Sequence, residues 1–202
     1  FLHGQDVHAR TAAEVFGVPL DEVTGTMRTR AKAVNFGIVY GISDFGLAKQ
    51  LDINRGEAGR YIENYLGAYP KVKQYLEDIV RKAKQDGYVT TYFGRRRYIP
   101  ELSSGKKMEV AFGERVAMNS PIQGTAADII KLAMVNIAKK LASGGYDARL
   151  VLQVHDELII ESAKSCADAV RELLKTEMEN AVSLSVPLTV EVLSGDSWYE
   201  AK

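Results

Sequence analysis

The chain has 202 residues, with 26 Lys and Arg against 26 Asp and Glu, and therefore no formal net charge. One cysteine excludes a disulfide framework and a cysteine-rich zinc site, and three histidines argue against a histidine-rich metal centre. No stretch reaches the roughly 18 uncharged apolar residues of a membrane span. We therefore expect a cytoplasmic protein without a membrane partner.

The charge is unevenly distributed along the chain. Residues 1–150 carry 22 Lys and Arg against 16 Asp and Glu, whereas residues 151–202 carry 4 against 10. The basic part favours a polyanion such as nucleic acid, while the acidic part suits either divalent cations or a solvated surface.

The pattern of residues 6–87 is mainly helical and is interrupted by short Gly, Pro and Asp-containing segments. Residues 88–93 and 97–99 predict a small hairpin with a basic tip. Helical patterning returns at 108–141, where Asn119-Ser120-Pro121 predicts a break between two tandem helices.

After Gly144-Gly145 the pattern predicts strand, strand, helix and strand, at residues 148–154, 157–162, 164–183 and 187–194. Apolar residues at helical spacing in the third segment predict that this helix covers one face of an antiparallel sheet. We expect an α+β fold in which residues 1–107 are mainly helical and residues 108–202 hold the tandem helices and the sheet.

The segment RTRAKAVNFGIVYG, residues 28–41, carries Arg28, Lys32, Phe36 and Tyr40 at every fourth position. On a helix these side chains form one stripe, with two cations followed by two aromatic rings. Such a stripe suits a nucleoside triphosphate, because cations bind phosphates and rings stack on bases or sugars. The alternative is that the rings face the core and the cations are solvated.

The segment RLVLQVHDELIIE, residues 149–161, predicts a tight hairpin with His155, Asp156 and Glu157 at its tip. Three ionisable groups at a turn are compatible with a metal site or with an ordinary solvated turn.

Other polar residues are weaker candidates for binding. Arg115, Asn119 and Gln123 recur every four residues and offer donors for phosphate, sugar and base edges, but solvated helices show the same spacing. His8 suits either a phosphate donor or a capping residue near a helix start.

The chain resembles family A DNA polymerases of the bacterial DNA polymerase I type from end to end. The resemblance depends on the ordered occurrence of RTRAKAVNFGIVYG, NSPIQGTAAD and QVHDE. It implies a DNA-directed DNA polymerase of replication and repair, with primer-template DNA and dNTP as partners and Mg²⁺ as cofactor. The first motif then lies on the fingers helix and the last on a palm hairpin.

The resemblance also implies a role for each matching residue. Arg28 and Lys32 hold the triphosphate, with Lys32 a candidate proton donor to pyrophosphate, and His8 approaches the phosphates. Phe36 packs on the deoxyribose and Tyr40 lies beside the templating base. Asp156 is a metal ligand with Glu157 close by. The residues implied to contact primer-template DNA are Arg115, Asn119, Gln123 and His155.

One departure from the family is the absence of its upstream Asp-x-Ser-x-x-Glu motif, which supplies the other metal-binding aspartate. We therefore expect a fragment, fingers with part of a palm, that is inactive alone and belongs to a monomeric parent. Two alternatives remain: a non-catalytic nucleic-acid-binding module, and a metal phosphohydrolase that uses His155 and Asp156.

Overall fold

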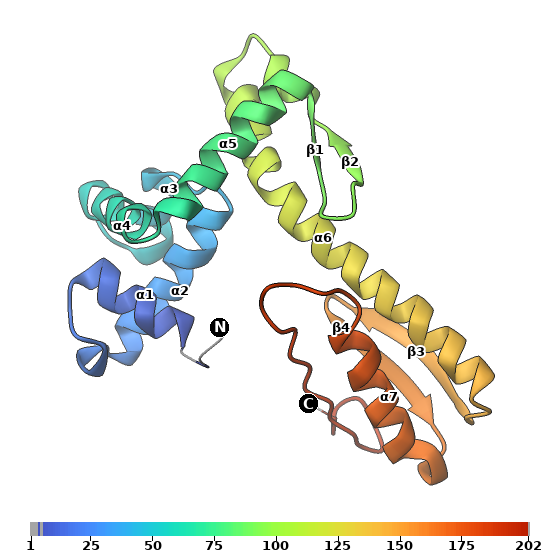
Figure 1. The fold of residues 1–202 in the computed structure, drawn as a ribbon. Coiled ribbons are helices and arrows are strands. Elements are labelled where there is room, and N and C mark those ends of the chain that lie inside the picture. The colour runs from blue at the N-terminus through green and yellow to red at the C-terminus, as the bar shows by residue number, and fades with distance from the viewer. Residues whose placement is uncertain (1–3, 5, 202) are drawn as a thin grey trace. The chain divides into compact units, whose positions relative to one another are not determined.

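The structure is a computed structural model that describes residues 4 and 6–201. It has the expected α+β class, mostly helical with two small antiparallel sheets (Figure 1). The chain packs as two compact units, one ending at Gly124 and the next beginning at Thr125. This division falls after the predicted boundary at 107/108, and the assignment of fingers and partial palm stays a prediction.

The first unit begins with a group of short helices. In chain order they are α1 (Val7–Phe16), the 3-10 helix η1 (Leu20–Glu22), α2 (Gly25–Val39), α3 (Asp44–Leu51), α4 (Arg55–Ala68) and α5 (Pro70–Asp86). Side-chain oxygens of Asp6, Thr24, Ser43 and Asn54 accept backbone N–H groups at the starts of α1 to α4. These caps satisfy donors that a helix leaves unpaired at its start.

The core of this helical group lies between α1, α2, α3 and α4. Val15, Val34, Ile38, Leu47 and Tyr65 are buried there and form one apolar cluster. Because Val34 and Ile38 come from one side of α2, the opposite side of that helix carries exposed residues.

The predicted basic hairpin is confirmed as β1 (Tyr88–Thr90) paired antiparallel with β2 (Arg96–Tyr98). The 3-10 helix η2 (Pro100–Ser103) follows. Val89 and Ile99 are buried against α5 and α6, so the hairpin is anchored while its tip stays exposed.

The prediction of two tandem helices is wrong, because α6 (Lys107–Ser143) is one continuous helix with Pro121 inside it. Proline removes one backbone hydrogen bond and normally ends or kinks a helix. Here the Ser120 hydroxyl bonds back to the Val116 carbonyl at 2.7 Å. Residues on both sides of Pro121 are also buried, such as Ala117 and Ile130, and this packing offsets the lost bond.

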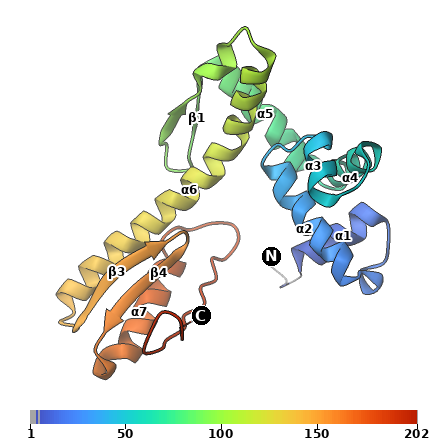
Figure 2. The same cartoon turned by 180° about the vertical axis from the view of Figure 1, so that it is seen from behind.

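The second unit contains the predicted hairpin. Strands β3 (Ala148–Val154) and β4 (Glu157–Ser162) pair antiparallel with the expected bounds, and η3 (Lys164–Cys166) and α7 (Ala167–Glu179) follow. The end of α6 and α7 both cover one face of this hairpin, which confirms the predicted cover by α7 (Figure 2).

The strand predicted at residues 187–194 is wrong, because this part of the described chain forms no regular element. Strands β3 and β4 pair with each other, and the described residues supply no third strand to which the segment bonds. Side chains of α7 hold it instead: Glu179 accepts from the Val190 backbone N–H at 3.1 Å, and Arg171 donates to Ser194 at 2.8 Å.

None of the helices among the described residues is both long enough and apolar enough to cross a membrane.

Gly41 follows the end of α2 and lies close to α6. Its φ is 70°, a left-handed conformation that L side chains rarely adopt. A Cβ atom at this position would lie 3.1 Å from Met118 Sδ and 3.2 Å from Arg115 Cγ. The glycine therefore permits both the turn after α2 and its close approach to α6.

Gly41→Ala is expected to lower the free energy of unfolding by about 1–2 kcal/mol, because alanine is strained in the left-handed region. The matched control is Gly59→Ala in α4, where a Cβ atom meets nothing within 4 Å. That change is expected to raise stability by about 0.5–1 kcal/mol. Urea unfolding followed by circular dichroism compares them, and a Gly41→Ala protein as stable as the wild type would contradict the role of this turn.

Candidate functional sites on α2 and at the β3–β4 turn

The predicted stripe of Arg28, Lys32, Phe36 and Tyr40 lies on the exposed side of α2. Phe36 is 48% and Tyr40 39% exposed, so the alternative that these rings face the core is wrong. Exposed aromatic rings beside cations are available to stack on a ligand. The four residues are called the α2 stripe below.

His8 from α1 joins the α2 stripe. Its ring centroid lies 6.0 Å from that of Phe36, and the Phe36 and Tyr40 centroids are 6.2 Å apart. Both pairs are tilted, with interplanar angles of 43° and 33°. The rings of His8, Phe36 and Tyr40 thus form a continuous row. The cations of the α2 stripe lie toward the N-terminal end of α2.

Asn35 holds the His8 ring in place. Its amide nitrogen lies 3.0 Å from His8 Nδ1, and its amide oxygen lies 3.1 Å from the Thr11 hydroxyl. Thr11 is fully buried and also bonds the Val7 carbonyl at 2.8 Å. Because Asn35 engages Nδ1, Nε2 is the ring nitrogen that lies outside this contact.

Asp6 connects α1 to the first cation of the α2 stripe. One carboxylate oxygen accepts the backbone N–H groups of His8 at 2.9 Å and Ala9 at 3.1 Å, which caps α1. The other oxygen accepts from Arg28 Nε at 2.6 Å. Sequence analysis missed both Asp6 and Asn35, although the position of Asp6 before a helical pattern is a signal for a cap.

The candidates on α6 are Arg115, Asn119 and Gln123. Because α6 is continuous through Pro121, these residues lie along one side of one helix rather than on two helices. Arg115 and Gln123 are exposed, and the Arg115 guanidinium lies 6.0 Å from the centre of the Phe112 ring. The Asn119 amide oxygen is buried without a hydrogen-bond partner among the described residues, which is a costly state for a polar atom.

The tip of the β3–β4 hairpin is a two-residue turn made by His155 and Asp156. His155 has a positive φ of 53°, and the Gln153 side chain donates to its carbonyl oxygen at 3.0 Å. Such a conformation is uncommon for a residue other than glycine and is often found at functional sites. The turn exposes His155, Asp156 and Glu157 together.

Within the part of the chain that the structure describes, these carboxylates do not form a complete metal site. No group of three or more His, Cys, Asp or Glu side chains suited to a metal occurs among residues 4 and 6–201. Two hard cations require several oxygen ligands, whereas the turn offers Asp156 and Glu157. The described residues therefore fit one part of a two-metal site and not the whole of it.

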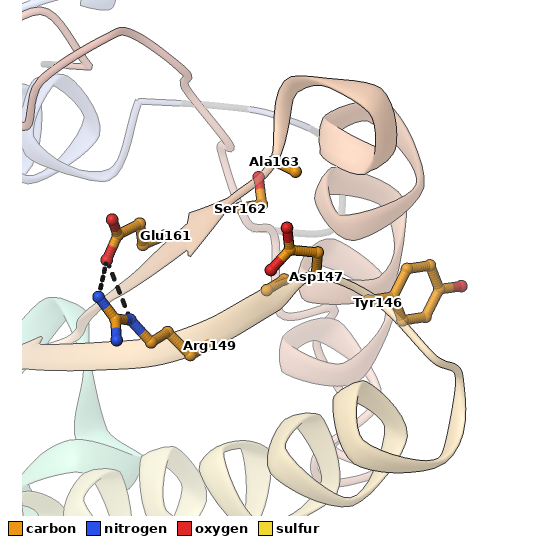
Figure 3. A pocket seen from close by; sticks show the side chains of 7 residues that line it. Tyr146, Asp147, Arg149, Glu161, Ser162 and Ala163 are labelled. Carbon is orange, nitrogen blue, oxygen red and sulfur yellow. Dashed lines mark hydrogen bonds and ion pairs between the residues drawn. The ribbon is translucent and has the colours of Figure 1, made fainter.

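A hollow of about 510 Å³ lies at the other end of the hairpin, between the start of β3 and the end of β4 (Figure 3). Two of its charged groups are engaged with each other, since Arg149 donates to Glu161 Oε2 through Nε at 3.0 Å and Nη2 at 2.8 Å. This pairing raises the pKa of Arg149. The hollow and the Asp156 turn lie at opposite ends of the hairpin. Ala148 pairs with Ser162 beside the hollow, and Val154 pairs with Glu157 beside the turn.

Comparisons with known proteins show the family to which the chain belongs. The family model described as DNA polymerase family A matches residues 1–200. The chain belongs to DNA polymerase family A. DNA polymerase I of Caldicellulosiruptor bescii is 53% identical over the whole chain, and that of Bacillus subtilis is 55% identical. The chain spans about a quarter of these relatives, 24% and 23% of their lengths.

A solved structure has the same fold. It is the POL domain of Pol1 from M. smegmatis in complex with DNA primer-template and dNTP, with a TM-score of 0.93 and 45% sequence identity. The match covers 98% of this chain and 35% of that chain. Membership of family A leaves the metal phosphohydrolase alternative without support.

The contact between Asp6 and Arg28 predicts a pH dependence of stability through the pKa of Asp6. The hydrogen bond from Arg28, and then that from the Ala9 backbone, lower the pKa of Asp6 below its ordinary value of 3.8. A lowered pKa contributes stability that is complete above roughly pH 4 and is lost as the pH falls through the folded-state pKa. Arg28→Ala is expected to raise the pKa of Asp6 toward 3.8.

Carboxyl carbon NMR titration of the folded chain measures this change. Asp44 is the internal control, because its own partner Arg55 lowers its pKa in the same way and is left intact. An Asp6 titration that is unchanged in Arg28→Ala would contradict the contact.

Proposed function

We propose that the full-length protein to which this chain belongs is a template-directed DNA polymerase, which adds deoxynucleotides from dNTP to a primer 3′ end in replication and repair. The observation that carries the proposal is the exposed α2 stripe with His8 beside it, in a chain whose whole length matches family A. The M. smegmatis structure was solved with primer-template and dNTP, which supports these partners.

In this proposal the α2 stripe is the nucleotide-binding surface. Arg28 and Lys32, near the start of the helix, contact the triphosphate, and His8 Nε2 faces the same phosphates. Phe36 packs on the deoxyribose and Tyr40 lies beside the templating base. Lys32 also protonates the leaving pyrophosphate, because an ammonium group at this point supplies both charge and a proton.

Primer-template DNA is bound by residues that offer donors to phosphates, sugars and base edges. Arg115, Asn119 and Gln123 present such groups along one side of α6, and His155 presents one at the hairpin turn. The net positive charge of residues 1–150 adds a sequence-independent attraction to phosphate. DNA affinity should therefore fall as salt is raised.

Enzymes of this family depend on metal ions, and we assign Mg²⁺ to this protein. Asp156 supplies one carboxylate ligand and Glu157 a second carboxylate beside it, on a turn that the two strands hold rigid. The remaining ligands come from parts of the polymerase outside this chain. In the same proposal the protein is a monomer in the bacterial cytoplasm, associated with the nucleoid.

Primer extension by the full-length protein tests the proposed function. Wild-type protein with Mg²⁺ and four dNTPs should extend a primed template, whereas Asp156→Asn should lower turnover by roughly a hundredfold or more and leave DNA affinity unchanged. Asp147→Asn, an exposed carboxylate at the other end of the same hairpin, is the matched control and should extend normally. The isolated 202-residue chain should show no extension.

Three outcomes would contradict parts of the proposal. Wild-type protein that binds DNA without extending it would identify a non-catalytic nucleic-acid-binding module. Near-normal extension by Asp156→Asn would remove Asp156 from the metal site. Extension by the isolated chain at the full-length rate would show that another residue of the chain supplies the missing ligand.

Lys32→Ala tests the α2 stripe. Losing phosphate contacts and proton donation should lower the single-turnover incorporation rate at saturating dNTP by roughly a hundredfold. The control is Lys49→Ala, another exposed lysine, on α3. If both variants incorporate nucleotide at the wild-type rate, Lys32 is a solvated helix cation and the stripe is not the triphosphate surface.

A further inference from the structure

The Asp6 carboxylate joins two predicted triphosphate-binding residues that lie on different helices. One oxygen fixes the backbone of His8 on α1, and the other fixes the side chain of Arg28 on α2, at 2.9 Å and 2.6 Å. The carboxylate is itself oriented by two backbone N–H groups at the start of α1. It is therefore a preorganised partner for Arg28 rather than a freely moving surface acid.

The atoms that form this contact leave the outer edge of Arg28 available. The hydrogen bond reaches Nε, on the side of the guanidinium, and in the described part of the chain neither Nη atom takes part in a hydrogen bond or ion pair. The two Nη groups form the edge that binds two phosphate oxygens together. Asp6 thus fixes the plane of the guanidinium without occupying its phosphate-binding edge.

We infer that Asp6 is a positioning residue for nucleotide binding, which holds Arg28 ready for the triphosphate before the nucleotide arrives. A long arginine side chain loses rotamer freedom when it binds a ligand, and a chain already held in place loses less. This inference rests on the proposed function of the α2 stripe and extends it to a residue outside that stripe.

The charge of Asp6 opposes this effect, because a carboxylate repels a triphosphate. Its charge is offset by Arg28 at 2.6 Å and by the positive end of α1. Side chains that are 49% and 42% exposed are also screened by water and salt. Loss of the ordered guanidinium is therefore the larger consequence of removing the carboxylate.

Asp6→Asn separates the contact from the helix cap. Asparagine caps a helix as well as aspartate does, so α1 should keep its start while the ion pair to Arg28 is lost. The matched control is Asp44→Asn, because Asp44 lies in the first turn of α3 and accepts from Arg55 Nε at the same 2.6 Å. Arg55 lies outside the proposed site.

The test is single-turnover incorporation by the full-length protein on a primed template. Asp6→Asn should raise the apparent dissociation constant of the correct dNTP by roughly three- to fivefold, the upper part of the range for an exposed ion pair. Its maximal incorporation rate, DNA affinity and thermal midpoint should match those of Asp44→Asn. In an Arg28→Ala background the same change should no longer weaken dNTP binding, because Asp6 acts through Arg28.

Two results would overturn the inference. One is dNTP binding by Asp6→Asn that equals or exceeds wild-type affinity, which would make Asp6 a neutral or repulsive neighbour. The other is an equal loss of affinity in the Arg28→Ala background. Wild-type protein that does not extend primers would instead overturn the proposed function, so the two failures are distinguishable.

Discussion

The contact between α1 and α2 is the constraint on which the proposed nucleotide surface depends. Buried Val15 and Val34 belong to one core cluster, so α2 has one side committed to packing and the other to solvent. Polar bonds from Asn35 to His8 and from Asp6 to Arg28 then fix the exposed side chains. The apolar contact sets the orientation of the helix, and the polar contacts set the direction of the groups it presents.

The spacing of polar and apolar residues in the sequence predicted those elements in which this spacing follows a single period. The β3–β4 hairpin has the expected bounds because both strands are apolar and the polar residues between them leave room for a two-residue turn. The α2 stripe was also predicted from its spacing. Its exposure was not, because periodicity alone does not tell which face of a helix meets the core.

The missed residues depend on contacts between distant parts of the sequence. Asp6 and Arg28 are 22 residues apart, and His8 and Asn35 are 27 apart, so no local spacing relates them. Local rules predict a break at Pro121, yet packing on both sides keeps α6 intact. The segment 187–194 has strand propensity but bonds to α7 side chains instead, since a strand requires a partner strand.

The metal chemistry of the family places a different demand on the chain. Carboxylate ligands must be held rigidly, and the Asp156 turn meets this demand through strand pairing and the Gln153 contact with the His155 carbonyl. Two neighbouring acids are still fewer than two cations require. A chain that spans about a quarter of its relatives thus contains only part of the proposed metal site, together with the proposed nucleotide surface.

The central claim is that nucleotide binds the surface made by α1 and α2. Hydrogen exchange of the full-length protein on a primed template, with and without the correct next dNTP, tests it most directly. We predict that dNTP slows exchange in peptides covering the start of α1 and the whole of α2, while α4 and α7 change little. Unchanged exchange in α1 and α2, with protection elsewhere in the chain, would contradict the account.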